Sequence, residues 1–184
     1  MNIITTILSP QKEKITLQTE IIGPDGKPEA VTSTNLEING EQAVSQSLMV
    51  ENYKLWSTTN PILYKVVSRI LKNGKVVDSY DTPFGFRYFE FTAHRGFFLN
   101  GENMKLNGVC LHHDLGPLGA AFNLSAQKRQ LILLKEMGCN AIRTSHNPPA
   151  PELLQLTDEM GFLVIDQAFD EWKYAKTKNG YHTL

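Results

Sequence analysis

Asn140-Ala-Ile-Arg-Thr-Ser-His-Asn-Pro-Pro-Ala-Pro151 is the stretch of sequence that decides the fold. It follows Gly138, which suits the left-handed position after the end of a helix, and it begins with a short apolar strand, Ala141 and Ile142. The strand runs into polar side chains, and the prolines that follow forbid further pairing and permit a helix only from about Pro151 onward. A strand that stops in polar side chains just before a new helix is typical of the active face of an α/β protein.

The pattern around this stretch repeats. Residues 135–144 are echoed by residues 158–166, because in each a helix ends at a glycine and an apolar strand follows after one or two residues. With a preceding strand over 105–111, the region predicts the order β-loop-α-β-loop-α-β. Polar side chains follow all three strands: His112, His113 and Asp114, then Arg143, Ser145 and His146, then Asp166 and Gln167. Three such clusters on one edge of a sheet indicate a binding or catalytic face rather than three unrelated loops.

Two helices are expected between these strands. Ser125 is the predicted N-cap of a helix that runs to Met137, and the second helix covers about 151–160. Parallel strands joined by helices need right-handed crossovers, and three strands with two helices do not close a sheet. The natural completion of such a run is an eight-stranded βα barrel, of which this chain would hold the first third.

The first half of the chain, residues 1 to about 88, alternates with a period of two and predicts strands only. Residues 14–21 and 31–38 read as half-buried strands, and Asn39-Gly40 is expected to close the second of them. Five to seven short strands of this kind predict a β-sandwich. Trp56 and Tyr64 are expected in its core or at an interface.

Composition excludes several classes of protein. The 184 residues carry a formal net charge of −1 without clusters of lysine or arginine, which argues against nucleic acid and membrane surfaces as partners. No window approaches 18 apolar residues, and the amino terminus does not read as a signal peptide, so periplasm and cytoplasm both stay open. Cys110 and Cys139 are expected to be small core residues rather than a disulfide. No metal site and no cofactor are expected, because adjacent histidines rarely converge on one ion and no spaced third ligand appears.

Five motifs in a fixed order resemble a known family. They are Phe84-Gly-Phe-Arg87, Gly96-Phe-Phe-Leu-Asn-Gly101, Leu106-Asn-Gly-Val-Cys-Leu-His-His-Asp114, Asn140-Ala-Ile-Arg-Thr-Ser-His-Asn-Pro148 and Asp158-Glu-Met-Gly-Phe-Leu-Val-Ile-Asp166. Together they resemble glycoside hydrolase family 2, the family of β-galactosidase, β-glucuronidase and β-mannosidase. The resemblance implies an immunoglobulin-like β-sandwich over residues 1–88 that lacks its first strand. It also implies that residues 92–184 are the first βα units of an incomplete (β/α)₈ catalytic barrel.

The same resemblance implies an activity. The family consists of retaining exo-β-glycosidases, and retaining hydrolysis needs two carboxyl groups ~5–5.5 Å apart. In the family both are glutamates, at the ends of barrel strands four and seven. Asp114, Asp166, Asp170 and Glu171 match neither position, so the chain is expected to carry no catalytic residue and to be inactive alone. Its implied partner is a terminal β-linked sugar.

The residues expected to bind the substrate are His146, Asn147, Arg143, His113, Asp114, Asp166 and Trp172. His146 matches the family histidine that faces the sugar in the −1 subsite, although it could instead tie a loop to the barrel. Arg143 matches an arginine that orients active-site carboxylates or clamps a loop. Gln167 stands where the family has a glutamate, and Trp172 stands in a stretch where many β-galactosidases have Glu-Thr-His, so galactose specificity stays open.

Two other expectations concern the chain as a whole. A non-catalytic module that binds carbohydrate or a partner chain is the alternative to a piece of an enzyme. An incomplete barrel leaves the outer edges of its terminal strands open, which predicts self-association.

Overall fold

The computed structural model describes residues 1–169, 171, 173–178 and 180. The chain divides into two compact units, the first made of Met1–Leu55 and Ile62–Phe86, the second of Trp56–Pro61 and the described residues from Arg87 onward. Neither of the helices in the described ranges is long and apolar enough to cross a membrane.

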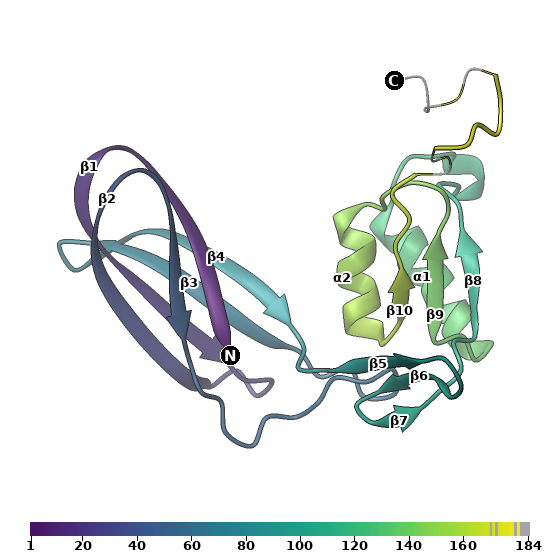
Figure 1. The fold of residues 1–184 in the computed structure, drawn as a ribbon, viewed down its shortest axis with the longest axis horizontal. Coiled ribbons are helices and arrows are strands. Elements are labelled where there is room, and N and C mark those ends of the chain that lie inside the picture. Colours follow the sequence, from purple (N-terminus) through teal and green to yellow (C-terminus); the bar gives the residue numbers. More distant parts are fainter. Residues whose placement is uncertain (170, 172, 179, 181–184) are drawn as a thin grey trace. The chain divides into compact units, whose positions relative to one another are not determined.

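The first unit is built from four strands in the order β2-β1-β3-β4. Their bounds are Asn2–Ile22 (β1), Pro28–Ser47 (β2), Tyr64–Lys72 (β3) and Lys75–Phe84 (β4). The prediction of five to seven short strands is therefore wrong for the described residues. The first two strands are instead 21 and 20 residues long, and they curve together along their length (Figure 1).

The curve of β1 and β2 has a local cause. Their pairing jumps from Ser9 opposite Gly40 to Glu13 opposite Ile38, so three residues of β1 face one residue of β2. An insertion of this kind bends a strand and increases its twist. Gly40 has a φ of 78°, as expected for Asn-Gly, but the strand continues through it. The predicted turn at Asn39-Gly40 is thus a bulge inside a long strand.

Because of the bulge, β1 and β2 contribute to two layers. The second half of β1 pairs with the first half of β2 on one side and with β3 on the other, in one sheet. Residues Asn2–Ser9 of β1 and 40–47 of β2 form a two-stranded ribbon. The ribbon side chain of Gln46 accepts a hydrogen bond from Thr19 (2.6 Å) and donates one to the carbonyl of Leu17 (3.2 Å). Both contacts are buried. They connect the ribbon to the sheet as in a β-sandwich.

The second unit begins with a small antiparallel sheet. Its strands are Phe89–Thr92 (β5), Gly96–Leu99 (β6) and Glu102–Asn103 (β7), and the predicted Asn-Gly turn lies between the last two. Asn100 and Gly101 there have φ values of 54° and 84°. The predicted hairpin is confirmed.

The βα part follows, and its order is as predicted. Its elements are β8 (Gly108–Leu111), the short helix η1 (Gly116–Leu118), α1 (Leu124–Glu136), β9 (Ala141–Thr144), α2 (Pro151–Met160) and β10 (Leu163–Ile165). The three strands are parallel in the order β10-β9-β8. Helix α1 starts two residues earlier than expected, because its N-cap is Asn123 rather than Ser125. Asn123 accepts a hydrogen bond from the amide of Ala126 at 3.0 Å.

Both helices cover the same face of this sheet. Its central residue Ile142 is buried together with Leu131 and Leu134 of α1 and Leu153 and Leu156 of α2. The glycines that follow the two helices, Gly138 and Gly161, have φ values of 86° and 72°. This confirms the predicted helix ends.

Trp56 belongs to the second unit rather than to the sandwich. Its side chain is 2% exposed, its indole N–H donates to the carbonyl of Asp158 in α2 (2.8 Å), and Arg87 lies over its ring. The ammonium of Lys135 donates to the carbonyls of Thr58 and Gly161 at 2.8 and 2.7 Å. The short segment Trp56–Pro61 is therefore part of the βα unit, whereas Tyr64 lies in the sandwich core as expected.

Candidate active site

The carboxyl ends of β8, β9 and β10 lie at one edge of the parallel sheet. Residues of β9 pair with both neighbours, Arg143 with Cys110 of β8 and with Ile165 of β10. The loops that leave these three strands therefore start side by side, which is where α/β proteins place their sites. The predicted polar clusters lie in these loops.

His146 is the meeting point of the three loops. Its Nδ1 lies 3.0 Å from Oε1 of Gln167, which follows β10. Its ring meets that of His112, which follows β8, edge to face with centroids 5.3 Å apart. When Nδ1 is the protonated nitrogen of the ring, it donates to this amide oxygen. The Nε2 atom of a neutral His146 is then an acceptor, suited to a hydroxyl group.

A threonine that the sequence analysis did not select connects β9 to the loop after β10. The hydroxyl of Thr144, which is 3% exposed, donates to Oδ1 of Asp166 (3.0 Å) and accepts from the amide of Gln167 (3.0 Å). Asp166 thus orients the loop that carries Gln167, and through it the ring of His146. Thr144 stands in the polar stretch that follows Ile142, and this position could have identified it from the sequence.

Arg143 points to the face of the sheet opposite the helices. Its guanidinium donates to the hydroxyl of Ser145 (3.0 Å) and to the sulfur of Cys110 (3.4 Å). The hydrogen bond from Arg143, followed by one from Ser145, lowers the pKa of the Cys110 thiol below its ordinary value. Cys110 is exposed, so the expectation that it is a core residue is wrong, because strand alternation places it beside Arg143 rather than under the helices. Cys139 does pack against the helix core, and both cysteines are free as predicted.

His113 and Asp114 line a hollow of about 230 Å³ together with His112, Thr144 and Leu153. Asp114 accepts a hydrogen bond from the amide of Gly116 at 2.8 Å, which fixes the turn into η1. His146 is not among the residues that line this hollow, but His112 lines it and also packs on the ring of His146. The contact of Asp114 with Gly116 is local.

The remaining candidates have fewer contacts. Asn147 is exposed in the loop between β9 and α2. Trp172 and Asp170 lie outside the described residues. Over the described part of the chain, no three His, Cys, Asp or Glu side chains are arranged to hold a metal ion.

Sequence comparison accounts for this arrangement. Residues 2–87 match the profile of the glycosyl hydrolases family 2, and residues 91–182 match that of the family 2 TIM barrel domain. The β-galactosidase BoGH2A of Bacteroides ovatus is 46% identical over 185 residues, which cover 98% of this chain and 22% of that protein. The chain belongs to glycoside hydrolase family 2. Its fold is an immunoglobulin-like sandwich followed by the start of a TIM barrel, as the resemblance implied.

Solved structures of the family agree. A glycosyl hydrolase family 2 member from Bacteroides cellulosilyticus superposes with a TM-score of 0.92 and 38% identity, over 99% of this chain and 24% of that one. A β-glucuronidase from Bacteroides uniformis gives a TM-score of 0.82 and 33% identity, over 89% and 20%. This chain spans about a fifth to a quarter of the length of these relatives.

Proposed function

We propose that residues 1–184 supply the sandwich and one wall of the −1 subsite of a retaining exo-β-glycosidase of the β-galactosidase type. The observation that carries the proposal is the position of His146, held by Gln167 and beside His112 where three parallel strands end. This geometry leaves Nε2 of a neutral imidazole as an acceptor for a sugar hydroxyl. The relatives are named β-galactosidases and β-glucuronidases, which supports a terminal β-linked sugar as the substrate.

The residues fall into roles. His146 binds a hydroxyl of the sugar, with His112 packed on its ring and with Asn147 at the rim. Gln167, Thr144 and Asp166 position that ring through their hydrogen bonds. Arg143, His113 and Trp172 are further contacts of the substrate or of the groups around it.

The chemistry needs two carboxyl groups on opposite sides of the glycosidic bond. Residues 1–184 supply three parallel strands, whereas the family pattern places its glutamates on strands four and seven. The isolated chain is accordingly proposed to bind sugar weakly and to hydrolyse none.

The test is a titration of the chain with galactose and with glucuronic acid, observed by NMR. His146→Ala is expected to abolish the shifts, whereas His94→Ala, in the β5–β6 turn, leaves them unchanged. Binding that survives in His146→Ala would favour the second candidate, a carbohydrate-binding module. Turnover of an aryl β-glycoside by the pure chain would refute the assignment of the glutamates.

Self-association through the open barrel edges is the second part of the proposal. Strands β8 and β10 each have one neighbour in the described sheet, and Ile165 at the end of β10 is 51% exposed. Open strand edges invite pairing with another chain. Sedimentation should show association that rises with concentration and weakens in Ile165→Lys, and a monomer at every concentration would contradict it.

A further inference from the structure

The first unit contains a groove, unrelated to the βα site, with a volume of about 680 Å³. One wall is the edge strand segment Met1–Leu8, and the floor is formed by β3 and β4. The lining residues of the floor are Val66, Ser68, Ile70, Asp78, Ser79, Tyr80, Thr82 and Phe84. The groove lies wholly within this unit.

The groove is open because the two layers of the sandwich differ in width. Register pairs Val66 with Thr82, Ser68 with Tyr80 and Ile70 with Asp78, so the inward face continues from β3 onto β4. The facing ribbon has only two strands, and its cover ends before β4. Leu17, under the ribbon, is fully buried, whereas Tyr80 on β4 is 74% exposed.

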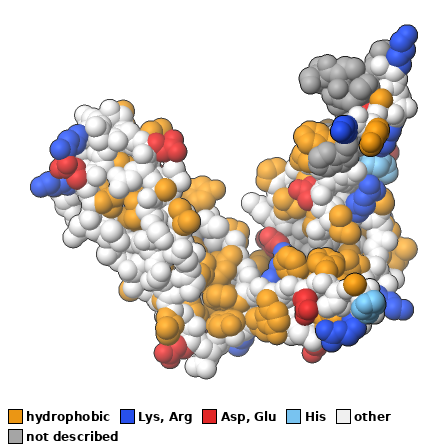
Figure 2. All heavy atoms as spheres, viewed as in Figure 1, with side chains coloured by type: hydrophobic (Ala, Val, Ile, Leu, Met, Phe, Trp, Pro, Cys, Tyr) orange, Lys and Arg blue, Asp and Glu red, His pale blue; other side chains and the backbone are white. Residues whose placement is uncertain are grey.

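Exposed apolar side chains mark the two sides of the groove. Ile4 and Leu8 of β1, which border the groove, are 67% and 74% exposed, and Tyr80 of β4 is 74% exposed. Figure 2 shows hydrophobic side chains exposed on one face of this unit. A monomeric sandwich does not ordinarily leave such a surface to water.

The edge of β1 above the groove is unpaired. Asn2–Ser9 pair with β2 along one side only, and the pairing of β1 with β3 begins at Thr16. In the part of the chain that the structure describes, no strand pairs with the other side of Asn2–Ser9. Free N–H and C=O groups next to an apolar groove are the template for strand addition.

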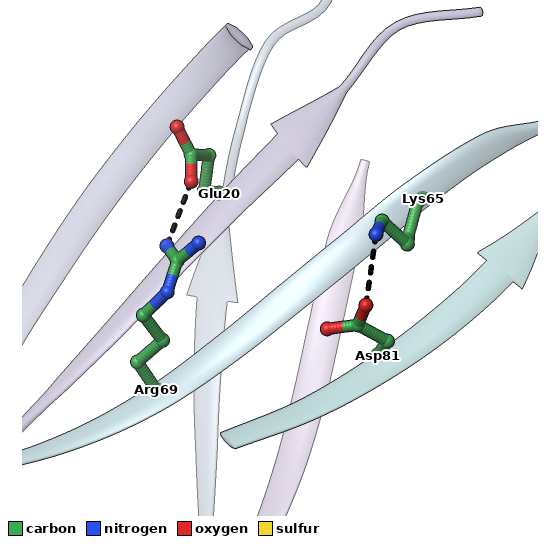
Figure 3. A network of polar contacts seen from close by, with 4 residues as sticks. All are labelled: Glu20, Lys65, Arg69 and Asp81. Atoms are coloured by element: carbon green, nitrogen blue, oxygen red, sulfur yellow. Dashed lines mark hydrogen bonds and ion pairs between the residues drawn. The ribbon is translucent and has the colours of Figure 1, made fainter. Parts of the chain in front are cut away.

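The charge of the lining indicates what kind of side chain a molecule bound in the groove would carry. Of the described residues that line the groove, Asp78 has the one charged side chain. On the opposite face of the same sheet, the acidic groups have cations as partners: Lys65 binds Asp81 at 2.8 Å and Arg69 binds Glu20 at 2.7 Å (Figure 3). Among the described side chains, none forms an ion pair with Asp78, which accepts a hydrogen bond from the adjacent amide of Ser79. A lysine or arginine on the occupant complements it.

We propose that this groove binds a single extended segment of polypeptide from outside residues 1–184. The segment adds as a strand to the free edge of Asn2–Leu8 and turns alternate apolar side chains onto Ile70 and Tyr80. A basic residue near one end of the segment pairs with Asp78. The spacing of sandwich layers, about 10 Å, accepts one layer of side chains from a strand but not the face of a second folded copy.

The test uses the full chain and a capped synthetic peptide of about ten residues, the length of an ordinary strand. Valine alternates with threonine in the peptide, and lysine stands near one end. Saturable binding is expected by calorimetry, with hydrogen exchange slowed at alternate amides of residues 2–8. A matched peptide with proline at its central valine should not bind, because proline lacks the amide donor.

Variants of the protein locate the binding. Ser68→Phe fills the groove floor and should weaken binding by about tenfold or more, whereas Ser33→Phe on the outer face of β2 leaves it unchanged. Asp78→Lys should weaken binding of the lysine peptide about two- to fivefold and favour a glutamate peptide instead. Circular dichroism checks the fold of each variant.

Three results of the peptide experiments would overturn the proposal. They are absence of binding by the parent chain, equal binding by a folded Ser68→Phe, and protection of amides outside residues 2–8. If Ser68→Phe does not fold, two other measurements test the proposal. They are the preference of Asp78→Lys for the glutamate peptide and the hydrogen-exchange protection of residues 2–8. The parent chain could instead dimerise without peptide, in a way that Ser68→Phe or Asp78→Lys prevents. That result would assign the groove to a second copy and refute the binding of a single extended segment.

Discussion

Nδ1 of His146 lies 3.0 Å from Oε1 of Gln167, and this contact joins the loop after β9 to the loop after β10. With Nδ1 as the donor to this amide oxygen, Nε2 of the neutral ring is left as an acceptor. Gln167 is itself held by the hydroxyl of Thr144, which also donates to Asp166. Three side chains, from the loop after β10 and the end of β9, thus orient the ring of His146.

Gln167→Ala is expected to weaken galactose binding about three- to tenfold, the effect of one lost hydrogen bond to the ring. His146→Ala should weaken it further, because the acceptor itself is removed. NMR titration measures both. Equal affinities of Gln167→Ala and the parent would show that the amide does not position His146.

Asp158→Asn tests the charge beside Trp56. Burial raises the pKa of Asp158, partly opposed by the charge of Arg87. A folded-state pKa above the unfolded value means that the folded state binds more protons, so the stability of the parent falls as pH rises through this window. Asp158 also lies near the carboxyl end of α2, where a negative charge is unfavourable.

Asp158→Asn should therefore be more stable than the parent at pH 7, and the difference should disappear as the pH falls below the unfolded pKa of the carboxyl group. Urea unfolding at a series of pH values measures this. A variant that is less stable at pH 7, or a difference that is independent of pH, would contradict the prediction.

Trp56→Ala should destabilise the βα unit by about 3–5 kcal/mol, because a buried indole and its hydrogen bond to Asp158 are lost. The helices of the described chain lie in that unit, so ellipticity at the helix wavelength reports on it. Tyr80→Ala, at a side chain 74% exposed, is the control and should have little effect on the same signal. Unchanged helix unfolding in Trp56→Ala would show that Trp56–Pro61 does not support the βα unit.

Asn123→Ala should cost about 0.5–2 kcal/mol of stability through loss of the cap on α1. Ser125→Ala, at the position that sequence alone indicated as the cap, should change stability by less than about 0.5 kcal/mol. Thermal unfolding of both variants decides between the two residues. A larger effect of Ser125→Ala would contradict the observed cap.

Local signals in the sequence identified the βα region well. Pro151 starts α2 and Gly161 follows its end, because proline and glycine restrict the backbone whatever the surroundings. Asn123 was missed as a cap because Ser125 stands two residues further on and is equally suited to the role. Both residues satisfy the sequence preferences of an N-cap, so the sequence places the start of α1 only to within two residues.

Features that depend on distant contacts were not predictable. The place of Trp56 is set by Asp158, 102 residues away, and the continuation of β2 through Gly40 depends on a bulge in β1. The exposure of Cys110 follows from its register with Arg143, which a single strand does not reveal. His146 was selected from its motif, but Gln167 as its partner emerged only from the way the two loops meet.

The central claim is that this chain forms part of a glycosidase site in which His146 contacts the sugar. The most direct test is a chimera in which residues 1–184 replace the matching stretch of the Bacteroides ovatus β-galactosidase, assayed for kcat/KM on an aryl β-galactoside. The folded chimera should be active, and His146→Ala should lower its kcat/KM by about tenfold or more while His94→Ala does not. A folded chimera whose activity is unaffected by His146→Ala would contradict the claim.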